Sequence, residues 1–376
     1  MRILIIARGY PTKDYPLNGI FEYDQAKALA ASGHEVIFAA IDLRSIRRVR
    51  RWGTHSFSQD GVHIEAVSLP LGNLPKPILH FTRQQALKRQ YNNVVLNYGR
   101  PDIIHSHFIE QGYAVVKVLS DQGIPLFHTE HYSGMNQAKL SDYYTKLGSE
   151  TYKKMTKVLV VSNHLRKNLE DKFGIEATVV PNIVDLSAFN TEIKPKDMSQ
   201  FNFISVGRLD KNKRMDLLIN AFHQAFKDDP TVNLFIIGDG PEREHLDQLI
   251  KNYKLSVRVH LLGQQDRVNI AKKMEECHSF VLASKSETFG VVLIEAMAMG
   301  LPIVSTKSGG PKDFISQENG LLVETDNIEA FSNALLEVKK IYANFNVNAI
   351  ANTTRNYYRP EHIAIAFIKL YKTQLN

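Results

Sequence analysis

The chain has a single cysteine, Cys277, which excludes an intrachain disulfide framework. No apolar run approaches the roughly 20 residues that are needed to span a bilayer. The strand-like run at 2–7 is too short for the core of a signal peptide. No Asp-x-Asp pair occurs, which disfavours a divalent cation bridging a diphosphate. These absences favour a cytoplasmic protein, soluble or peripheral to a membrane, that needs no metal.

Length and charge point to two domains with different surfaces. The 376 residues are long for one domain, and 44% of them are hydrophobic. Residues 1–183 hold 23 Lys and Arg against 16 Asp and Glu, whereas residues 184–376 hold 23 of each. The basic first half suits an anionic partner such as membrane lipid, a lipid-phosphate acceptor or nucleic acid. A general solubility charge is the alternative.

Short apolar runs alternate with helical patterns, which predicts doubly wound α/β sheets of parallel strands. Strands are expected at 2–7, 35–41, 63–69, 102–106, 125–130, 157–162, 201–206, 232–238, 257–262, 279–284, 302–306 and 320–324. Helices are expected at 20–32, 79–98, 111–121, 138–154, 163–172, 213–226 and 360–375. The predicted parts are a first domain (1–183), an irregular linker (184–200), a second domain (201–358) and a terminal helix (359–376).

The stretch from Glu287 to Gly300 holds two carboxylates, Glu287 and Glu295, on either side of a Phe289-Gly290 step that opens an apolar helix. In an open α/β sheet, ligands bind in such a loop, outside the carboxyl end of a strand. The first amides of the helix can hold a phosphate, and the carboxylates can accept hydrogen bonds from sugar hydroxyls. A surface carboxylate pair beside a core helix is the alternative.

A second motif, Gly207-Arg208-Leu209 with Lys213, follows the strand at 201–206. Two cations five residues apart at a strand-to-helix turn can neutralise a diphosphate. They would act most strongly as negative charge grows on the leaving phosphate. A solvated basic loop is the alternative.

Together, Glu287-x7-Glu295 and Gly207-Arg208-Leu209-x3-Lys213 resemble the motifs of retaining glycosyltransferases of the group 1 or family 4 type. The resemblance implies the GT-B fold, in which two Rossmann-like domains face a central cleft and a C-terminal helix crosses back to the first domain. Arg214 stands where the family has Gly, and Asn18 where it has the first of two glycines. The donor-binding residues that the resemblance implies are Gly19, Gly207, Arg208, Lys213, Gly238, Glu287, Phe289, Gly290, Val291 and Glu295.

The resemblance also implies roles. Arg208 and Lys213 would stabilise the leaving diphosphate, Glu287 would orient the sugar, and Glu295 would bind the ribose. His107, the second histidine of His105-Ser106-His107, would contact the transferred sugar, which makes His107, Arg208, Lys213 and Glu287 the catalytic set. Glu130 and His131, at the next strand end, are expected on the acceptor side. A structural role for strand-end histidines is the alternative.

A basic segment in the first half suits an anionic membrane surface, because cationic residues are mixed there with an interfacial aromatic. A solvated loop is the alternative, and no nucleic-acid-binding motif is present. The residues expected at the membrane are Arg47, Arg48, Arg50, Arg51 and Trp52.

The implied activity is transfer of a sugar, with retained configuration, from a nucleoside-diphosphate sugar to an acceptor hydroxyl, without a cofactor or metal. UDP-sugars are the default donors by prevalence. The expected acceptor is a lipid-linked or cell-surface glycan precursor of the capsule or exopolysaccharide type, at the inner face of the cell membrane. The alternatives are a nucleotide-sugar epimerase of the same fold and a catalytically inactive, membrane-associated partner subunit.

Overall fold

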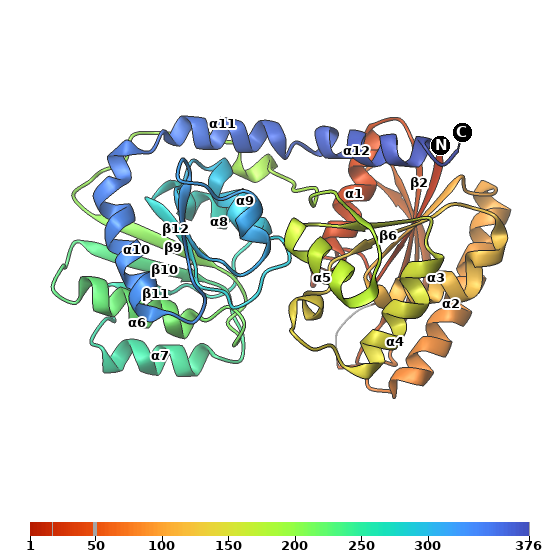
Figure 1. Cartoon of the computed structure of the whole chain (residues 1–376), viewed down its shortest axis with the longest axis horizontal. Coiled ribbons are helices and arrows are strands. Elements are labelled where there is room, and N and C mark those ends of the chain that lie inside the picture. Colours follow the sequence, from red (N-terminus) through yellow and green to blue (C-terminus); the bar gives the residue numbers. More distant parts are fainter. Residues whose placement is uncertain (17, 48–50, 376) are drawn as a thin grey trace. The chain divides into compact units, whose positions relative to one another are not determined.

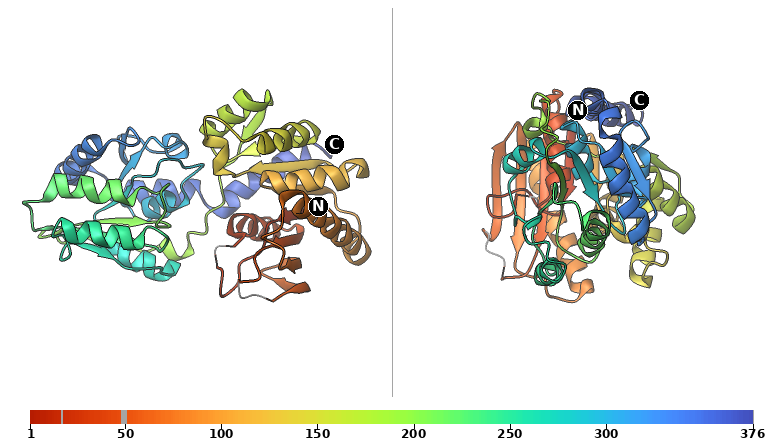
Figure 2. Two further views of the ribbon diagram at one scale, coloured as in Figure 1. Left: turned by 90° about the horizontal axis from the view of Figure 1, so that it is seen from below. Right: turned by 90° about the vertical axis from the view of Figure 1, so that its left-hand side faces the viewer.

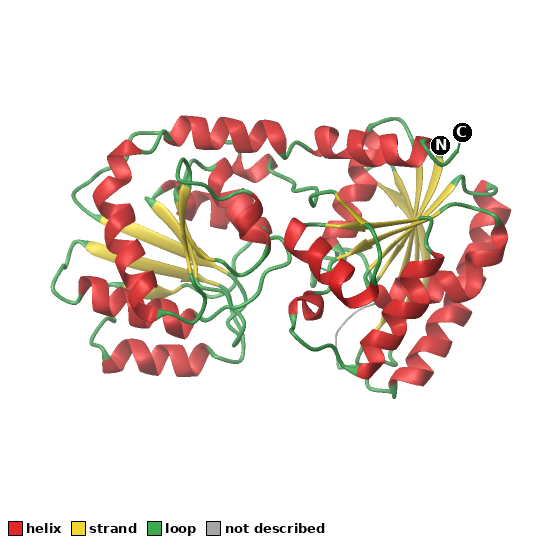
Figure 3. Cartoon of the chain, in the orientation of Figure 1, coloured by secondary structure: helices red, strands yellow, loops and turns green. Residues whose placement is uncertain are grey.

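The computed structural model describes residues 1–16, 18–47 and 51–375. The chain forms two compact units (Figure 1): unit 1 is Met1–Ile183 with Pro360–Asn376, and unit 2 is Val184–Arg359. Each unit is a sheet with helices on both faces (Figure 3). This confirms the α/β class with two Rossmann-like domains.

Unit 1 contains an eight-stranded sheet in the order β3-β4-β2-β1-β5-β6-β7-β8. Its strands are β1 (Arg2–Ala7), β2 (Glu35–Leu43), β3 (Gly53–Gln59), β4 (Val62–Leu69), β5 (Ile103–His107), β6 (Leu126–Glu130), β7 (Lys157–Val160) and β8 (Ala177–Val179). The side chains of β1 alternate between two cores: Ile3 and Ile5 pack on one face, and Leu4 and Ile6 on the other. Both faces of the strand are therefore buried, as a doubly covered parallel sheet requires.

Edge strand β3 was not predicted, and it is the one antiparallel strand that the described part of unit 1 contains. It forms a hairpin with β4 through Asp60 and Gly61, which have φ values of 52° and 75°. Two positive φ angles in a two-residue Asp-Gly loop are typical of a hairpin turn. The wholly parallel sheet expected from the sequence is thus wrong at this edge.

Helices cover the sheet of unit 1, with α2 beside α3 (Figure 1): α1 (Ile20–Ala31), α2 (Lys76–Tyr98), α3 (Ile109–Leu119), α4 (Asp142–Thr151), α5 (Asn163–Phe173) and α12 (Pro360–Lys372). The last helix belongs to this unit although 176 residues of unit 2 precede it. Its buried side chains Ile363, Phe367 and Tyr371 share a core with Tyr23 and Ala26 of α1.

Unit 2 contains a six-stranded parallel sheet in the order β11-β10-β9-β12-β13-β14. Its strands are β9 (Phe201–Val206), β10 (Val232–Ile237), β11 (Val259–Leu261), β12 (Ser279–Leu282), β13 (Ile303–Thr306) and β14 (Gly320–Val323). Its helices are α6 (Met215–Phe226), α7 (Arg243–Asn252), α8 (Arg267–Glu275), α9 (Val291–Ala298), α10 (Ile328–Ile341) and α11 (Val347–Tyr357). The left view of Figure 2 shows the helices of each unit flanking its sheet from a further direction.

The segment predicted as a linker, 184–200, packs against unit 2. Phe189 is fully buried, and Arg355 donates a hydrogen bond of 2.7 Å from Nη2 to the carbonyl oxygen of Thr191. Residues of irregular composition can therefore be part of a folded unit when their backbone groups find partners. Among the helices that the structure describes, none has both the length and the apolarity to cross a bilayer.

Candidate functional site

The strand order of the unit 2 sheet has its switch point between β9 and β12. Strands β10 and β11 extend the sheet of unit 2 on one side of β9, and β12, β13 and β14 extend it on the other. Loops at such a switch point diverge beyond the carboxyl ends of the strands and leave room for a ligand. The loops after β9 and β12 hold both predicted motifs, so the fold places them at this point.

Lys213 and Glu287 form an ion pair, with 2.5 Å between Nζ and Oε1. The two loops are also joined through Asn212, whose side chain donates to the carbonyl oxygen of Ser286 at 2.9 Å. In addition, the amide of Lys285 donates to the carbonyl oxygen of Asn212 at 2.7 Å. Both side chains of the ion pair are partly exposed, at 20% for Lys213 and 12% for Glu287, so a ligand can reach them.

Glu295 lies on α9, about one turn beyond the start of the helix, and forms a second ion pair. Its Oε1 is 3.2 Å from Nη2 of Arg267, at the start of α8, and its side chain is 9% exposed. Asp185 lies 4.0 Å from the same guanidinium. Arg267 was not predicted, because an isolated arginine after a loop carries no motif. Arg267 therefore places a cation beside the Glu295 carboxylate.

Helix α9 begins after Gly290, whose φ of 102° and ψ of 55° favour glycine. The amide of Val291 is among the first amides of the helix, which have no partner within the helix and carry the positive end of its dipole. Phe289 is 3% exposed, and its ring contacts Phe314 and Tyr358. The Phe289 side chain is therefore part of the core, and only its backbone is available to a ligand.

Glycine is needed where the loops after β9 and β10 meet. A Cβ on Gly238, which has a φ of 141°, would overlap the carbonyl oxygen of Gly207. Gly310 also lies close to the segment before α9, since a Cβ there would come within 2.6 Å of Phe289 Cα. The close approach to Gly207 explains Gly238 by packing, whereas a Cβ on Gly207 would make only ordinary contacts, 3.5 Å from the Lys213 side chain. A direct ligand contact remains a prediction for both residues.

Arg208 is more exposed than Lys213, at 69%, and its Nε lies 3.7 Å from Asp210. A long side chain in solvent keeps much of its rotamer freedom and must lose it on binding a ligand. Arg214, where the family has glycine, adopts φ 49° and ψ 44°, the left-handed conformation. It forms ion pairs with Asp216 and Asp326, so the turn that glycine would favour is made here by arginine.

In unit 1 the sheet reverses between β1 and β5, and His107 ends β5. Its ring stacks on that of His105 with 4.6 Å between centroids, and its Nδ1 lies 3.0 Å from Nε2 of His131. Burial lowers the pKa of His107 well below 6.5, and the nearby His131, His128 and Arg8 lower it further. His107 is thus a neutral imidazole near pH 7, and its buried Nε2 has no hydrogen-bond partner among the described residues.

Glu130 is fully buried and has several hydrogen-bond donors. The amides of His131 and Tyr132 donate to Oε1 at 2.9 and 2.8 Å, and Tyr152 donates to Oε2 at 2.7 Å. Burial alone would raise the pKa of Glu130, but hydrogen bonds from His128, Tyr152 and the Tyr132 amide outweigh burial and lower it. This arrangement favours a structural carboxylate over the predicted acceptor contact. His131, 8% exposed, lies nearer the surface.

Gly19, before α1, has a φ of 67°, and a Cβ there would overlap the carbonyl oxygen of Gly9. The adjacent Asn18 side chain donates to Oδ2 of Asp42 at 3.2 Å. Arg8, after β1, was not predicted: its guanidinium carbon lies 3.1 Å from the ring centroid of Phe108. A single arginine after a strand gives no sequence signal, yet it supplies a cation at the switch point of unit 1.

The basic segment is only partly described. Arg47 and Arg51 are exposed and Trp52 is half-buried, whereas Arg48 and Arg50 lie outside the described residues. Among the described residues, no group of three or more His, Cys, Asp and Glu side chains could hold a metal. Independence from metal remains a prediction.

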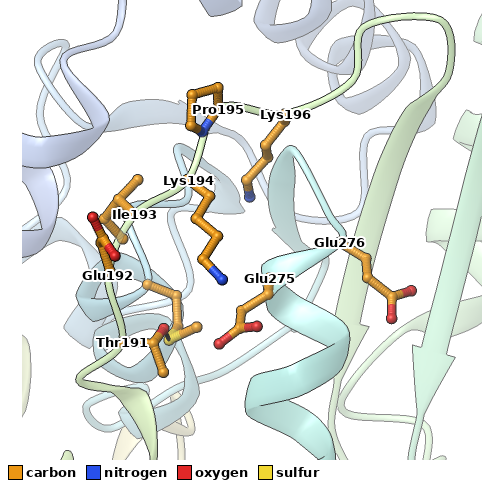
Figure 4. A pocket seen from close by; sticks show the side chains of 9 residues that line it. Thr191, Glu192, Ile193, Lys194, Pro195, Lys196, Glu275 and Glu276 are labelled. Atoms are coloured by element: carbon orange, nitrogen blue, oxygen red, sulfur yellow. Dashed lines mark hydrogen bonds between the residues drawn. The ribbon is translucent and has the colours of Figure 1, made fainter.

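A cavity of about 290 Å³ in unit 2 lies away from these motifs. Figure 4 shows its lining, in which Lys194 points toward Glu275. Glu275 and Glu276 precede β12, so the cavity lies near the amino end of that strand, whereas the motifs lie beyond its carboxyl end. It therefore plays no part in the predicted donor site.

Comparison with known proteins assigns the family. Residues 21–188 match the family model described as Glycosyltransferase Family 4, and residues 188–355 match that of Glycosyl transferases group 1. The N-acetylgalactosamine-N,N'-diacetylbacillosaminyl-diphospho-undecaprenol 4-alpha-N-acetylgalactosaminyltransferase of Campylobacter jejuni is 31% identical over 287 residues, which cover 71% of this chain and 73% of that protein. A human phosphatidylinositol N-acetylglucosaminyltransferase chain is 25% identical, with 95% of this chain and 74% of that protein covered.

Other matches are partial. The chain covers 65% of an uncharacterised glycosyltransferase of Methanocaldococcus jannaschii and about half (52%) of the yeast GPI3 protein.

Among solved structures, the sucrose-phosphate synthase of Thermosynechococcus elongatus has a TM-score of 0.82 at 22% identity, and the match covers 100% of this chain and 99% of that chain. The lipopolysaccharide galactosyltransferase WaaB has a TM-score of 0.74 at 18% identity, with 100% of both chains covered. The fold is that of GT-B glycosyltransferases, and the chain belongs to the glycosyltransferases of the group 1 and family 4 type.

Proposed function

We propose that the protein transfers a sugar from a nucleoside-diphosphate sugar to an acceptor hydroxyl. The observation that carries this proposal is the pairing of Lys213 with Glu287 across the switch point of unit 2, beside the start of α9. A cation, helix amides and carboxylates at one sheet edge match the parts of a sugar nucleotide: anionic phosphates flanked by hydroxyl-bearing sugars.

In the proposed donor complex, Lys213 and Arg208 contact the diphosphate, together with the first amides of α9. Glu287 accepts hydrogen bonds from hydroxyls of the transferred sugar, and Glu295, held by Arg267 at 3.2 Å, accepts them from the ribose. Negative charge grows on the leaving diphosphate as the glycosidic bond breaks. Lys213 and Arg208 therefore stabilise the transition state more than the bound donor, which raises the rate.

His107 is proposed to contact the transferred sugar. A neutral imidazole can donate or accept a hydrogen bond without introducing a charge. The reaction is proposed to retain the anomeric configuration, with the leaving phosphate taking the acceptor proton. Retention is tested by determining the anomeric configuration of the product by NMR.

A UDP-sugar donor is proposed because structural neighbours from Anabaena and Staphylococcus aureus were solved with UDP, although at 16–21% identity this likeness extends to the fold alone. A lipid-linked acceptor is proposed because the Campylobacter relative is named for a diphospho-undecaprenol acceptor and the human relative for phosphatidylinositol. The protein would then act at the inner face of the cell membrane.

The test is a screen of UDP-, GDP- and ADP-sugars with and without lipid-diphosphate glycan acceptors, read by nucleotide release and product mass. We expect nucleotide release that depends on acceptor and falls by at least about tenfold in Glu287→Ala. The matched control, Glu318→Ala, removes an exposed carboxylate of the same unit and should leave the rate unchanged. Conversion of the donor sugar without acceptor would identify an epimerase. Equal rates in both variants would refute the site.

A further inference from the structure

Helix α2 of unit 1 exposes apolar side chains along one stripe. Leu74, just before the helix, is 39% exposed, and Ile78 and Phe81 are 47% and 63% exposed. Ile78 and Phe81 are three residues apart within the helix, so they lie on one helical face, and Leu74 lies in the loop four residues before Ile78. The opposite face is buried and includes Arg83, Leu87 and Tyr91. The exposed apolar stripe is therefore additional to the face that packs in the core.

A neighbouring loop adds a fourth apolar side chain. Gly72 is so close to the backbone of Arg44 and Ser45 that a Cβ there would overlap it. The loop before α2 thus lies on the segment after β2. Ile46, 70% exposed, and Leu74 each follow this contact by only two residues. We call Ile46, Leu74, Ile78 and Phe81 the apolar ridge.

The two chain segments that carry the ridge are cationic. Neither 43–59 nor 66–101 contains an Asp or Glu, while each contains five Lys or Arg residues. Gln85 and Lys88 continue the exposed stripe of α2 at the same spacing of four and three residues. The exposed cations among the described residues of these segments include Arg47, Arg51, Lys76, Lys88 and Arg89.

The ridge lies near the carboxyl ends of the strands of unit 1, where His107 also lies. Helix α2 follows the carboxyl end of β4, and Arg83, in its second turn, approaches Glu110 of α3 at 3.7 Å between Nη2 and Oε2. Glu110 is only three residues beyond His107. A surface that held the ridge would thus be near the carboxyl edge of unit 1.

We propose that the apolar ridge and its cations dock unit 1 on an anionic lipid bilayer, with Ile78 and Phe81 inserted among the acyl chains. An interfacial helix combines apolar anchors with Lys and Arg, and its binding depends on both burial and anionic lipid. Long uninterrupted cationic segments oppose self-association, because two copies would bring like charges together. The inference rests on the proposed function in one respect, because a lipid-linked acceptor is the reason for docking on a membrane. The binding itself depends only on the ridge and its cations.

The test measures binding of the full chain to vesicles of phosphatidylcholine alone and of phosphatidylcholine with phosphatidylglycerol, by flotation. Trp52, the only tryptophan of the sequence, precedes Gly53, which pairs with Ser68 near the end of β4. Its fluorescence therefore reports on this edge. We expect binding to anionic vesicles only, with a blue shift of Trp52 emission and weakening at high salt.

The decisive variant is Ile78→Ser with Phe81→Ser, which we expect to weaken binding to anionic vesicles by about tenfold or more. Its matched control is Val257→Ser with Leu336→Ser, which removes apolar side chains that are 80% and 44% exposed in unit 2 and should bind like wild type. Circular dichroism and melting temperature confirm folding, since both pairs of residues lie on the surface.

Unchanged binding of the ridge variant, equal binding to neutral vesicles, or no binding at all would each overturn the inference. So would light scattering that showed a wild-type dimer and a monomeric ridge variant, because the ridge would then join two copies. Vesicle binding without any sugar transfer would refute the proposed function and leave docking intact. Sugar transfer to a detergent-dispersed acceptor without vesicle binding would refute docking and leave the proposed function intact.

Discussion

The two sheets place different chemistry at their carboxyl edges. In unit 1 the edge holds stacked imidazoles, and His105 and His107 are both fully buried. In unit 2 it holds ion pairs that reach solvent: Lys213 is 20% exposed and Arg208 69%. Buried neutral side chains are held in one position by their packing. Accessible cations, by contrast, can contact an anionic ligand at little desolvation cost. The same architecture thus supports a buried imidazole cluster beside Arg8 and Glu130 in unit 1, and an accessible, adaptable charged edge in unit 2.

The largest effect should come from breaking the charged edge. Lys213→Ala should lower sugar transfer by about two to three orders of magnitude, because a fixed cation at the leaving phosphate acts mainly in the transition state. Lys211→Ala removes an exposed cation of the same loop and is the control. Steady-state rates at saturating donor decide the matter; equal losses in both variants would mean that only the general charge of the loop is important.

The imidazole cluster of unit 1 should be the acid-sensitive part of the molecule. Burial lowers the pKa values of His105, His107 and His131 well below 6.5, so on acidification the unfolded chain binds protons before the folded chain does. The free energy of unfolding should therefore fall as the pH drops below about 6.5, by on the order of 2 kcal/mol at pH 5 for each imidazole that stays neutral. The lowered pKa of Glu130 acts in a more acidic range, with its stabilisation lost as the pH falls below about 4.5.

Urea unfolding at pH 7.5, 6 and 5 measures this dependence. His105→Gln should flatten it, and replacement of the exposed His245 by Gln should not. A stability independent of pH in this range would show that the buried imidazoles bind protons as readily in the folded state as in the unfolded state.

The terminal helix should contribute a smaller, specific stabilisation to the imidazole cluster. The hydroxyl of Tyr371, on α12, lies 2.5 Å from Nδ1 of His105, and Gln25 lies 3.1 Å from the same nitrogen. Tyr371→Phe should cost about 1–2 kcal/mol, because a buried acceptor loses a donor. Tyr357→Phe, at a ring that is 50% exposed, is the control. Equal melting temperatures for both variants would argue against the bond.

The smallest effect concerns the turn of unit 2 in which arginine replaces glycine. Arg214→Gly removes the ion pairs with Asp216 and Asp326 but relieves the left-handed backbone, so its stability should stay within about 1 kcal/mol of wild type. Arg214→Ala loses the pairs without that relief and should be about 1 kcal/mol less stable than the glycine variant. Chemical unfolding of both variants compares them; a more stable alanine variant would contradict this account.

The sequence predicted the alternation of strands and helices well where apolar runs were long. Strand β3 was missed because its exposed face is polar, although Asp60-Gly61 was a usable hairpin signal. The linker prediction was based on composition, and Phe189 shows why composition is insufficient there: one buried aromatic can attach an irregular segment to a core. Arg8 and Arg267 could not be identified, since each acts through a partner far away in sequence.

The order of residues by itself determined the two α/β halves and the local motifs, because side-chain periodicity and turn residues act over a few positions. It also determined the excess of cations in the first half. Only the tertiary structure decided that Lys213 meets Glu287, that Arg267 meets Glu295, and that Tyr371 reaches His105. These contacts join residues 28 to 266 positions apart, and the order of strands in a sheet, which no local pattern encodes, brings them together.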